Sequence, residues 1–161
     1  MRTLGCAVLV AVACAVNPAA HAHAAPSCGV NLDAPQIRAA IGSVPTVPEG
    51  WAWNQDPRSF NATSNYNPCA TLSAVIISVQ GATGSSPEQA MLFHNGNYLG
   101  TGTSKAYSFT TLNTAQTTDD TVALDYKDGR NVCTACPGPI TTVRYQWQGD
   151  HVVMLDPAPP W

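Results

Sequence analysis

The pattern of apolar and polar residues is most regular in residues 69–100, where an apolar run is followed by a polar break and then a hairpin. Residues 72–79 place leucine, valine and isoleucine close together with little polar alternation, which predicts a strand that is buried on both faces. Asn95-Gly96 lies between the apolar runs 91–93 and 98–99, and this arrangement predicts a two-residue β-turn. The expected hairpin pairs His94 with Asn97, Phe93 with Tyr98 and Leu92 with Leu99.

One short helix is predicted ahead of this region, because four apolar residues fall at i, i+3, i+4 and i+7 and so form one stripe. Asp33 can cap the helix and Pro35 suits its first turn. Gly42 and Pro45 bring it to an end. A short helix with a single apolar stripe is expected to pack on the face of a sheet. The stripe consists of Ile37, Ala40, Ile41 and Val44.

Alternating polar and apolar residues predict further strands in the second half of the chain. Residues 121–127 and 140–148 alternate clearly, while residues 106–112 can be a strand or an irregular crossing. Gly149-Asp150 fits a type II′ turn into residues 151–155. That turn pairs Trp147 with Val152 and Tyr145 with Met154. We therefore expect one α+β domain, in which an antiparallel sheet of five or six strands carries one short helix.

The connection between the helix and the central strand, residues 45–68, has no sustained period and is rich in proline, asparagine and aromatic residues. Its aromatic side chains can pin a long connection to the body of the domain. A long irregular segment can also be a binding loop. The anchors are Trp51, Trp53, Phe60 and Tyr66, and the candidate binding surface is formed by Trp51, Trp53, Tyr66 and His94.

The first 24 residues have the pattern of a secretory signal, with Arg2 at the positive end and an apolar core over residues 4–16. Cleavage after Ala24 leaves residues 25–161, a length that suits a single domain with a real core. Alternatively, the small residues before Cys14 approximate a lipid-attachment box, and a lipidated Cys14 would hold the chain at a membrane.

The charge of the chain argues against two classes of partner. Seven Lys and Arg residues stand against ten Asp and Glu residues, for a formal net charge of −3. The basic residues are scattered along the sequence, so we expect no surface for nucleic acid or for an anionic membrane. Membrane association is expected only through a lipid on Cys14. We expect a monomer, and the sequence does not indicate a partner.

Four cysteines follow the signal segment, and an even count in an exported chain favours disulfides. The adjacency of Cys133 and Cys136 suggests that they pair with each other and that Cys28 pairs with Cys69, among three possible pairings. Closing the longer loop should stabilise the fold by about 4 kcal/mol, and the short clip by about 2 kcal/mol.

Cys133-Thr134-Ala135-Cys136 is the one motif that names a reaction, thiol–disulfide exchange. That chemistry favours a first cysteine at a helix N-terminus, where the thiol pKa is lowered. Here a Pro-Gly-Pro sequence and a strand pattern follow the motif. We therefore favour a structural clip over a redox site as the interpretation of this pair. A zinc site ranks last, because two further ligands with suitable spacing are missing.

Other reactive residue types form no catalytic constellation. The two histidines after the signal segment, His94 and His151, both flank predicted turns. The serines lack a Gly-x-Ser-x-Gly elbow, and the aspartates do not follow the spacing of a calcium-binding loop. We therefore expect a non-enzymatic protein without catalytic residues, a metal ion or another cofactor.

Several short motifs occur in a recognisable order: Cys28-Gly29, Asn67-Pro68-Cys69-Ala70-x-Leu72-Ser73, Leu92-Phe93-His94-x-Gly96-x-Tyr98-Leu99-Gly100, Tyr145-x-Trp147-x-Gly149 and Asp156-Pro157. In this order and spacing the chain resembles the LppP/LprE lipoproteins of actinobacteria, from about Cys28 to Pro157. The resemblance implies a secreted or cell-envelope protein without an assigned reaction, and it supplies no catalytic residues.

The leading hypothesis is thus an exported, disulfide-fastened protein that acts by binding or by presenting a surface. Two alternatives stay open. One is a periplasmic thiol–disulfide oxidoreductase that uses Cys133 and Cys136. The other is a carrier of a small apolar ligand, with its pocket between the helix, the connection from Trp51 to Tyr66 and the sheet.

Overall fold

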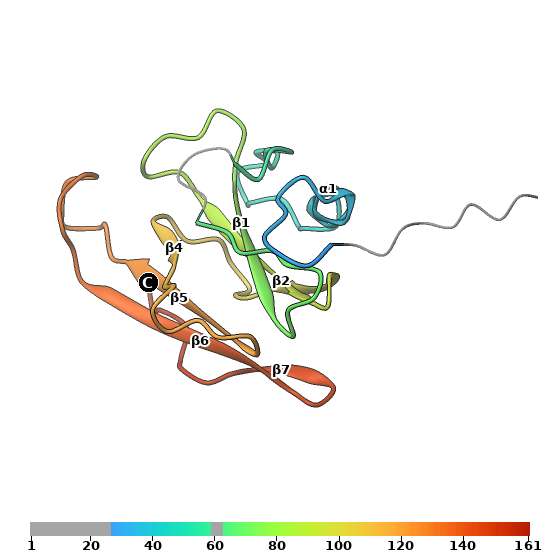
Figure 1. The fold of residues 1–161 in the computed structure, drawn as a ribbon. Coiled ribbons are helices and arrows are strands. Elements are labelled where there is room, and N and C mark those ends of the chain that lie inside the picture. Colours follow the sequence, from blue (N-terminus) through green and yellow to red (C-terminus); the bar gives the residue numbers. More distant parts are fainter. Residues whose placement is uncertain (1–26, 59–62) are drawn as a thin grey trace, which may run out of the picture.

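The computed structural model describes residues 27–58 and 63–161 (Figure 1). The predicted signal segment 1–24, the lipidation candidate Cys14 and the predicted anchor Phe60 lie outside these residues. The described residues form one helix, α1, followed by seven strands, β1 to β7. Within this part of the chain, no helix is long and apolar enough to cross a membrane.

Helix α1 spans Pro35–Ile41 and buries the predicted apolar stripe. Pro35 occupies the first turn and Gly42 ends the helix, as expected. The predicted cap was wrong, because the N-cap is Ala34 and no side chain caps the helix. Asp33 instead forms an ion pair with Arg58, with 2.6 Å between Oδ2 and Nη2.

The strands form two antiparallel sheets, where the sequence led us to expect one. The first sheet has the strand order β1-β2-β3 and the second the order β4-β5-β6-β7. The α+β class and the antiparallel pairing are confirmed. The strands are β1 Ser73–Ser78, β2 Glu88–His94, β3 Asn97–Thr101, β4 Thr110–Leu112, β5 Thr121–Lys127, β6 Ile140–Gln148 and β7 His151–Met154.

Strand β1 is buried on both faces, as its sequence predicted, because the first sheet is the middle of three layers. One face of β1 and β2 packs on α1 and the 45–68 connection, in a cluster that we call the helix-side core. The other face packs on the second sheet, in the inter-sheet core. Figure 1 shows α1 and the second sheet on opposite sides of β1 and β2.

Both predicted hairpins are present. Asn95 and Gly96 have φ values of 46° and 79°, which fits the expected two-residue turn. The pairs next to this turn are confirmed, but Leu92 lies opposite Gly100 and not opposite Leu99. The register shifts between Leu92 and Phe93. Leu99 is the unpaired residue of this β-bulge. Gly100, the next residue, has a positive φ of 139°, which glycine adopts readily. Trp147 pairs with Val152 and Tyr145 with Met154, as predicted.

The 45–68 connection covers the outer edge of β1 with side chains as well as with backbone hydrogen bonds. Ser64 Oγ accepts a hydrogen bond from the Ile76 N–H at 2.9 Å, and Asn65 Oδ1 accepts one from the Ala74 N–H at 2.8 Å. Thr63 Oγ1 accepts a bond from the Leu112 N–H of β4 at 2.8 Å. The connection therefore satisfies backbone groups of both sheets.

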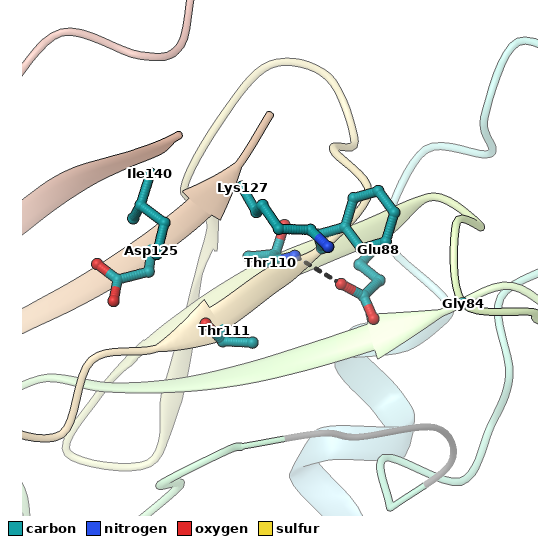
Figure 2. A pocket seen from close by; sticks show the side chains of 8 residues that line it. Gly84, Glu88, Thr110, Thr111, Asp125, Lys127 and Ile140 are labelled. Carbon is teal, nitrogen blue, oxygen red and sulfur yellow. Dashed lines mark hydrogen bonds between the residues drawn. The ribbon is translucent and has the colours of Figure 1, made fainter. Parts of the chain in front are cut away.

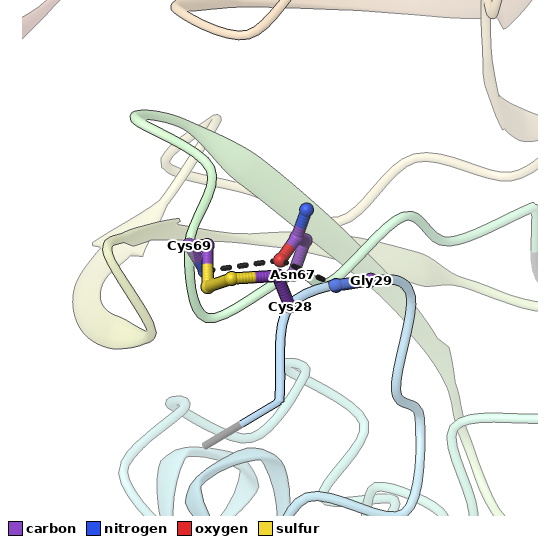
Figure 3. Close-up of a disulfide and its surroundings, with 4 residues drawn as sticks. All are labelled: Cys28, Gly29, Asn67 and Cys69. Atoms are coloured by element: carbon purple, nitrogen blue, oxygen red, sulfur yellow. Dashed lines mark hydrogen bonds between the residues drawn. A yellow bond between two sulfur atoms is a disulfide. The ribbon is translucent and has the colours of Figure 1, made fainter. Parts of the chain in front are cut away.

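The cysteines pair as expected, Cys28 with Cys69 and Cys133 with Cys136. The first bond joins residues 41 positions apart, with 5.3 Å between their Cα atoms. Figure 3 shows Asn67 beside it. Asn67 Oδ1 accepts hydrogen bonds from the Cys69 N–H at 3.0 Å and the Gly29 N–H at 3.1 Å. One amide side chain thus holds both ends of the disulfide-linked segment.

Candidate functional site

The four residues of the predicted binding surface do not lie on one face of the molecule. Trp53 and Tyr66 are buried in the helix-side core. Trp53 Nε1 donates to the Pro45 carbonyl at 2.9 Å, and Tyr66 Oη donates to the Gly96 carbonyl at 3.2 Å. Trp51 is the exposed member of the set, with 49% of its surface accessible. Two of the four therefore anchor the connection and expose little of their surface.

His94, the fourth member, is held between the two sheets. Its ring stacks on Trp147 of β6, with 3.8 Å between the ring centroids. Its Nδ1 lies 2.6 Å from the Thr71 carbonyl, and its Nε2 lies 2.9 Å from Asn95 Nδ2. Both ring nitrogens have protein partners, so this histidine serves packing between the sheets.

One hollow in the structure contains a buried carboxyl group and was not predicted from the sequence. It lies where the start of β2 meets β4 and the end of β5, and its volume is about 270 Å³ (Figure 2). We call it the Glu88 hollow. Its lining residues are Gly84, Glu88, Phe109, Thr110, Thr111, Asp125, Lys127 and Ile140.

Glu88 supplies a buried carboxyl group to this hollow, with 9% of the residue exposed. Its Oε2 accepts a hydrogen bond from the Thr110 N–H at 2.7 Å. Among the described residues, Oε1 has no hydrogen-bond donor and the carboxyl has no ion-pair partner. Burial raises the pKa of Glu88 from 4.5 to about 7, although the Thr110 N–H acts in the opposite direction. The carboxyl group therefore titrates near neutrality.

The other charged groups of the hollow are already engaged. Lys127 Nζ donates to the carbonyls of Thr134 at 2.8 Å and Cys136 at 3.1 Å, and it lies 4.1 Å from the Phe109 ring centroid. Asp125 accepts bonds from Asn113 and Thr142. Phe109 itself has a φ of 59°, a strained conformation for an aromatic residue. Glu88 is thus left with an oxygen that a ligand can reach.

This arrangement is suited to binding. A carboxylate oxygen accepts hydrogen bonds, and the Phe109 ring and the Ile140 side chain offer apolar contact beside it. Among the described residues, no histidine, cysteine or serine lines the hollow. Within residues 27–58 and 63–161, no three His, Cys, Asp or Glu side chains are grouped so that they could hold a metal ion.

A neighbouring hollow of about 360 Å³ gathers basic residues that are far apart in the sequence. It is lined by Lys105, Lys127 and Arg130, together with Trp161 of the extended C-terminal tail. Arg130 lies over the Trp161 ring at 5.3 Å, and Lys105 Nζ donates to the Trp161 carbonyl. In the folded protein, basic residues that are far apart in the sequence therefore lie around one hollow next to the C-terminal tail.

The space that an apolar-ligand carrier would need is occupied by side chains. Ile37 of α1, Tyr66 of the connection and Val75 of β1 are each at most 1% exposed and belong to one packed cluster. A separate hollow of about 350 Å³ lies beside this cluster, next to residues 45–49, Trp53 and Gln89. This lateral hollow is open to a ligand on the helix side.

A signal for Glu88 was present in the sequence. Residues 88–94 form one strand, and the period of two places Glu88 on the same face as Ala90 and Leu92. Both of these residues belong to the inter-sheet core. An acidic residue in phase with a buried apolar face indicates a buried carboxyl. The hollow itself depends on how the sheets meet, which local pattern does not specify.

The sequence comparisons identify the class of this protein. The family model described as LppP/LprE lipoprotein matches residues 64–150, more than half of the chain. The chain therefore belongs to the LppP/LprE lipoprotein family, as the motif resemblance predicted. Every residue that lines the Glu88 hollow lies inside the matched range.

Curated relatives carry the lipoprotein name LprE and come from mycobacteria. Those of Mycobacterium bovis and Mycobacterium tuberculosis are 36% identical to the chain over 129 residues, which cover 80% of the chain and 58% of each relative. The relative from Mycobacterium leprae is also 36% identical, over 59% of its length. The chain thus spans just under three fifths of the length of these relatives. No solved structure matches the chain.

Membership of this lipoprotein family identifies the chain as an exported protein of the cell envelope that works outside the cytoplasm. The two disulfides agree with that location, because such bonds persist in oxidising compartments. The mycobacterial relatives confirm the actinobacterial character expected from the resemblance.

Proposed function

We propose that this protein is a non-catalytic binding module of the cell envelope and that the Glu88 hollow is its ligand site. The observation that carries the proposal is the buried Glu88 carboxyl, which lines a hollow of about 270 Å³ and whose Oε1 has no donor from the described residues. A buried polar group normally has its hydrogen-bond partners, so a group left open at a hollow is a candidate contact for a ligand.

Binding is favoured over catalysis by the state of the neighbouring side chains. Acid–base or nucleophilic catalysis needs a second reactive group within hydrogen-bond reach of the first. Lys127 donates hydrogen bonds to two carbonyls, and Asp125 accepts hydrogen bonds from Asn113 and Thr142. Glu88 is left as a single acceptor, which can hold a ligand but has no partner for a reaction.

The proposal is tested by NMR screening of the exported, fully oxidised chain against a library of small polar and apolar compounds. We expect ligand-induced shifts to cluster at the residues that line the hollow, and each ligand to be recovered unchanged. Thr111→Trp should fill the hollow and abolish these shifts. Thr114→Trp, at an exposed position on another turn, is the matched control and should leave them intact.

Two results would contradict the proposal. One is a screen in which the hollow-lining residues show no ligand-dependent shift. The other is turnover of a compound that is lost when a single polar residue is substituted, because that result would identify an enzyme.

A second candidate function is thiol–disulfide exchange at Cys133 and Cys136. Both cysteines are exposed, and Lys127 donates to the Cys136 carbonyl in the same loop. Exposure gives a redox partner access to the bond. The reduction potential of this pair distinguishes the two functions. A value below about −300 mV indicates a structural clip, and a higher value indicates a labile or catalytic bond.

Attachment to the membrane is a further part of the proposal. We propose that the module is either tethered through a lipid on Cys14 or released by cleavage near Ala24. Intact-mass measurement of the exported protein separates the two outcomes, because acyl chains on Cys14 add mass while cleavage near Ala24 removes Cys14 altogether.

A further inference from the structure

We propose that the Glu88 hollow selects ligands that carry a primary ammonium group on a short apolar tail, an inference that rests on the binding function proposed above. Glu88 lacks a counter-charge, and an ammonium group supplies both a positive charge and hydrogen-bond donors for Oε1. A bound ammonium group would therefore supply the partner that the buried Glu88 carboxyl lacks among the described residues.

The charge inside the hollow agrees with a cationic ligand. The charged lining residues are Glu88 from β2 and Asp125 and Lys127 from β5, while β4, β6 and the Gly84 loop contribute none. With Glu88 ionised, these residues carry two negative charges and one positive charge. Lys127 Nζ is held by the carbonyls of Thr134 and Cys136, on the side of the Cys133–Cys136 loop. A cationic ligand can thus approach Glu88 without displacing an existing ion pair.

The remaining surface of the hollow favours an apolar tail. The Phe109 ring and the Ile140 side chain, which is 61% exposed, also line the hollow. Figure 2 shows Glu88 and Ile140 on different sides of Thr110 and Thr111. A ligand of a few carbon atoms with one ammonium end fits within about 270 Å³. Its tail would cover Ile140, which is otherwise exposed to water.

Protonation of Glu88 and ammonium binding compete, and this competition gives the inference a distinct signature. The pKa of Glu88 is about 7, so the ionised fraction rises from about 1% at pH 5 to about 90% at pH 8. An alkylammonium ion remains charged over this range. Its affinity should therefore increase about 90-fold between pH 5 and pH 8, with a proton released from Glu88 on binding at low pH.

The experiment is an NMR titration of the oxidised exported chain with n-butylammonium chloride, with 1-butanol as the neutral isostere. At pH 8 we expect n-butylammonium to bind at the hollow with a millimolar Kd, as suits a ligand of five heavy atoms. We expect 1-butanol to bind at least tenfold more weakly. Glu88→Gln should reduce the n-butylammonium affinity at least tenfold, while Glu49→Gln, at an exposed position, should leave it unchanged.

Two further variants keep the test decisive if Glu88→Gln alters the fold. Lys127→Met removes a positive charge from the lining of the hollow and should strengthen n-butylammonium binding several-fold. Thr111→Trp should abolish binding while it retains the carboxyl. Equal binding of n-butylammonium and 1-butanol, or an affinity that does not change with pH, would overturn the ammonium assignment and leave the general binding function standing. If neither this probe nor the screened library shifts the hollow-lining residues, the binding function itself fails.

Discussion

At the scale of single residues, the turn between β2 and β3 depends on one close approach. Gly96 is buried against Tyr66 and Pro68, and a Cβ placed on it would lie 3.1 Å from Tyr66 Oη and 3.2 Å from Pro68 Cβ. The Gly96 carbonyl also accepts a hydrogen bond from the Tyr66 hydroxyl group. The Asn-Gly pair predicted the turn from sequence, but only the fold shows that the glycine also makes room for the connection.

We therefore predict that Gly96→Ala destabilises the protein more than the same change at a free turn. Both Gly96 and Gly149 have positive φ values, 79° and 77°, so alanine carries a backbone cost of about 1–2 kcal/mol at either position. Nothing lies within 4 Å of a Cβ on Gly149. Urea unfolding should show Gly96→Ala to be the costlier change by about 1 kcal/mol or more. Equal losses in the free energy of unfolding would mean that Tyr66 moves aside for the added methyl group without an energetic cost.

A second residue-scale prediction concerns Glu88 and pH. Its pKa is raised in the folded state from 4.5 to about 7, so the neutral acid is favoured by folding. This contribution to stability is complete below about pH 4.5 and is lost as the pH rises through about 7. We compare the free energy of unfolding of Glu88→Gln with that of the parent. Between pH 4.5 and pH 8, this difference should shift in favour of the variant by up to about 3 kcal/mol.

Denaturant unfolding of the two proteins at several pH values measures this effect. Taking the difference between them cancels the aspartates whose pKa values are lowered, such as Asp128 and Asp156 at about 2. Glu49→Gln is the control and should track the parent across the range. A pH-independent difference between Glu88→Gln and the parent would show that the acid is solvated in the folded protein.

At the scale of elements, the sequence predicted most strands and both hairpins but not their division into two sheets. Alternation specifies which residues of a strand face the core, and it located β5 and β6 correctly, while the Gly149-Asp150 turn located β7. The unbroken apolar sequence of β1 already required a layer on each face, and one helix covers only one of them. The second layer is built from β4 to β7, whose long-range placement no local pattern encodes.

The 45–68 connection shows a related gap. Its aromatic anchors Trp53 and Tyr66 were predicted, yet its polar residues have the less obvious task of covering the edge of β1. Edge strands expose unpaired backbone groups, which proteins usually protect. Asn65 and Ser64 protect this edge with side-chain acceptors. A stretch without any period can therefore be well ordered by hydrogen bonds to its neighbours.

We predict that Asn65→Leu destabilises the protein by about 1–3 kcal/mol, because the part-buried Ala74 N–H loses its acceptor. Asn54→Leu is the matched control, since Asn54 Oδ1 accepts from the exposed Asp56 N–H, which water can satisfy. Amide hydrogen exchange supplies the local readout, with faster exchange expected at Ala74. Unchanged exchange at that amide would indicate that another acceptor replaces the side chain.

At the scale of the whole molecule, the two disulfides are expected to contribute unequally. The Cys28–Cys69 bond closes a loop of 41 residues, whereas Cys133 and Cys136 are three residues apart. In the chain-entropy model the longer loop contributes about 4 kcal/mol and the short one about 2 kcal/mol. The four cysteines of these disulfides are exposed, so replacement by serine leaves the cores intact.

Replacing Cys28 and Cys69 together by serine should accordingly lower the free energy of unfolding about twice as much as replacing Cys133 and Cys136 together. Denaturant titration of the two double variants beside the parent measures the difference. An equal or reversed order would show that the unfolded chain keeps the N-terminal segment close to β1 without the bond.

The position of the Cys28–Cys69 bond also has a mechanical consequence. Helix α1 and the whole 45–68 connection lie within the loop that the bond closes. Tension applied to the chain ahead of residue 28 therefore passes through the sulfur atoms to the start of β1. The helix carries none of this load and stays docked on its sheet while the polypeptide in front of it is pulled taut.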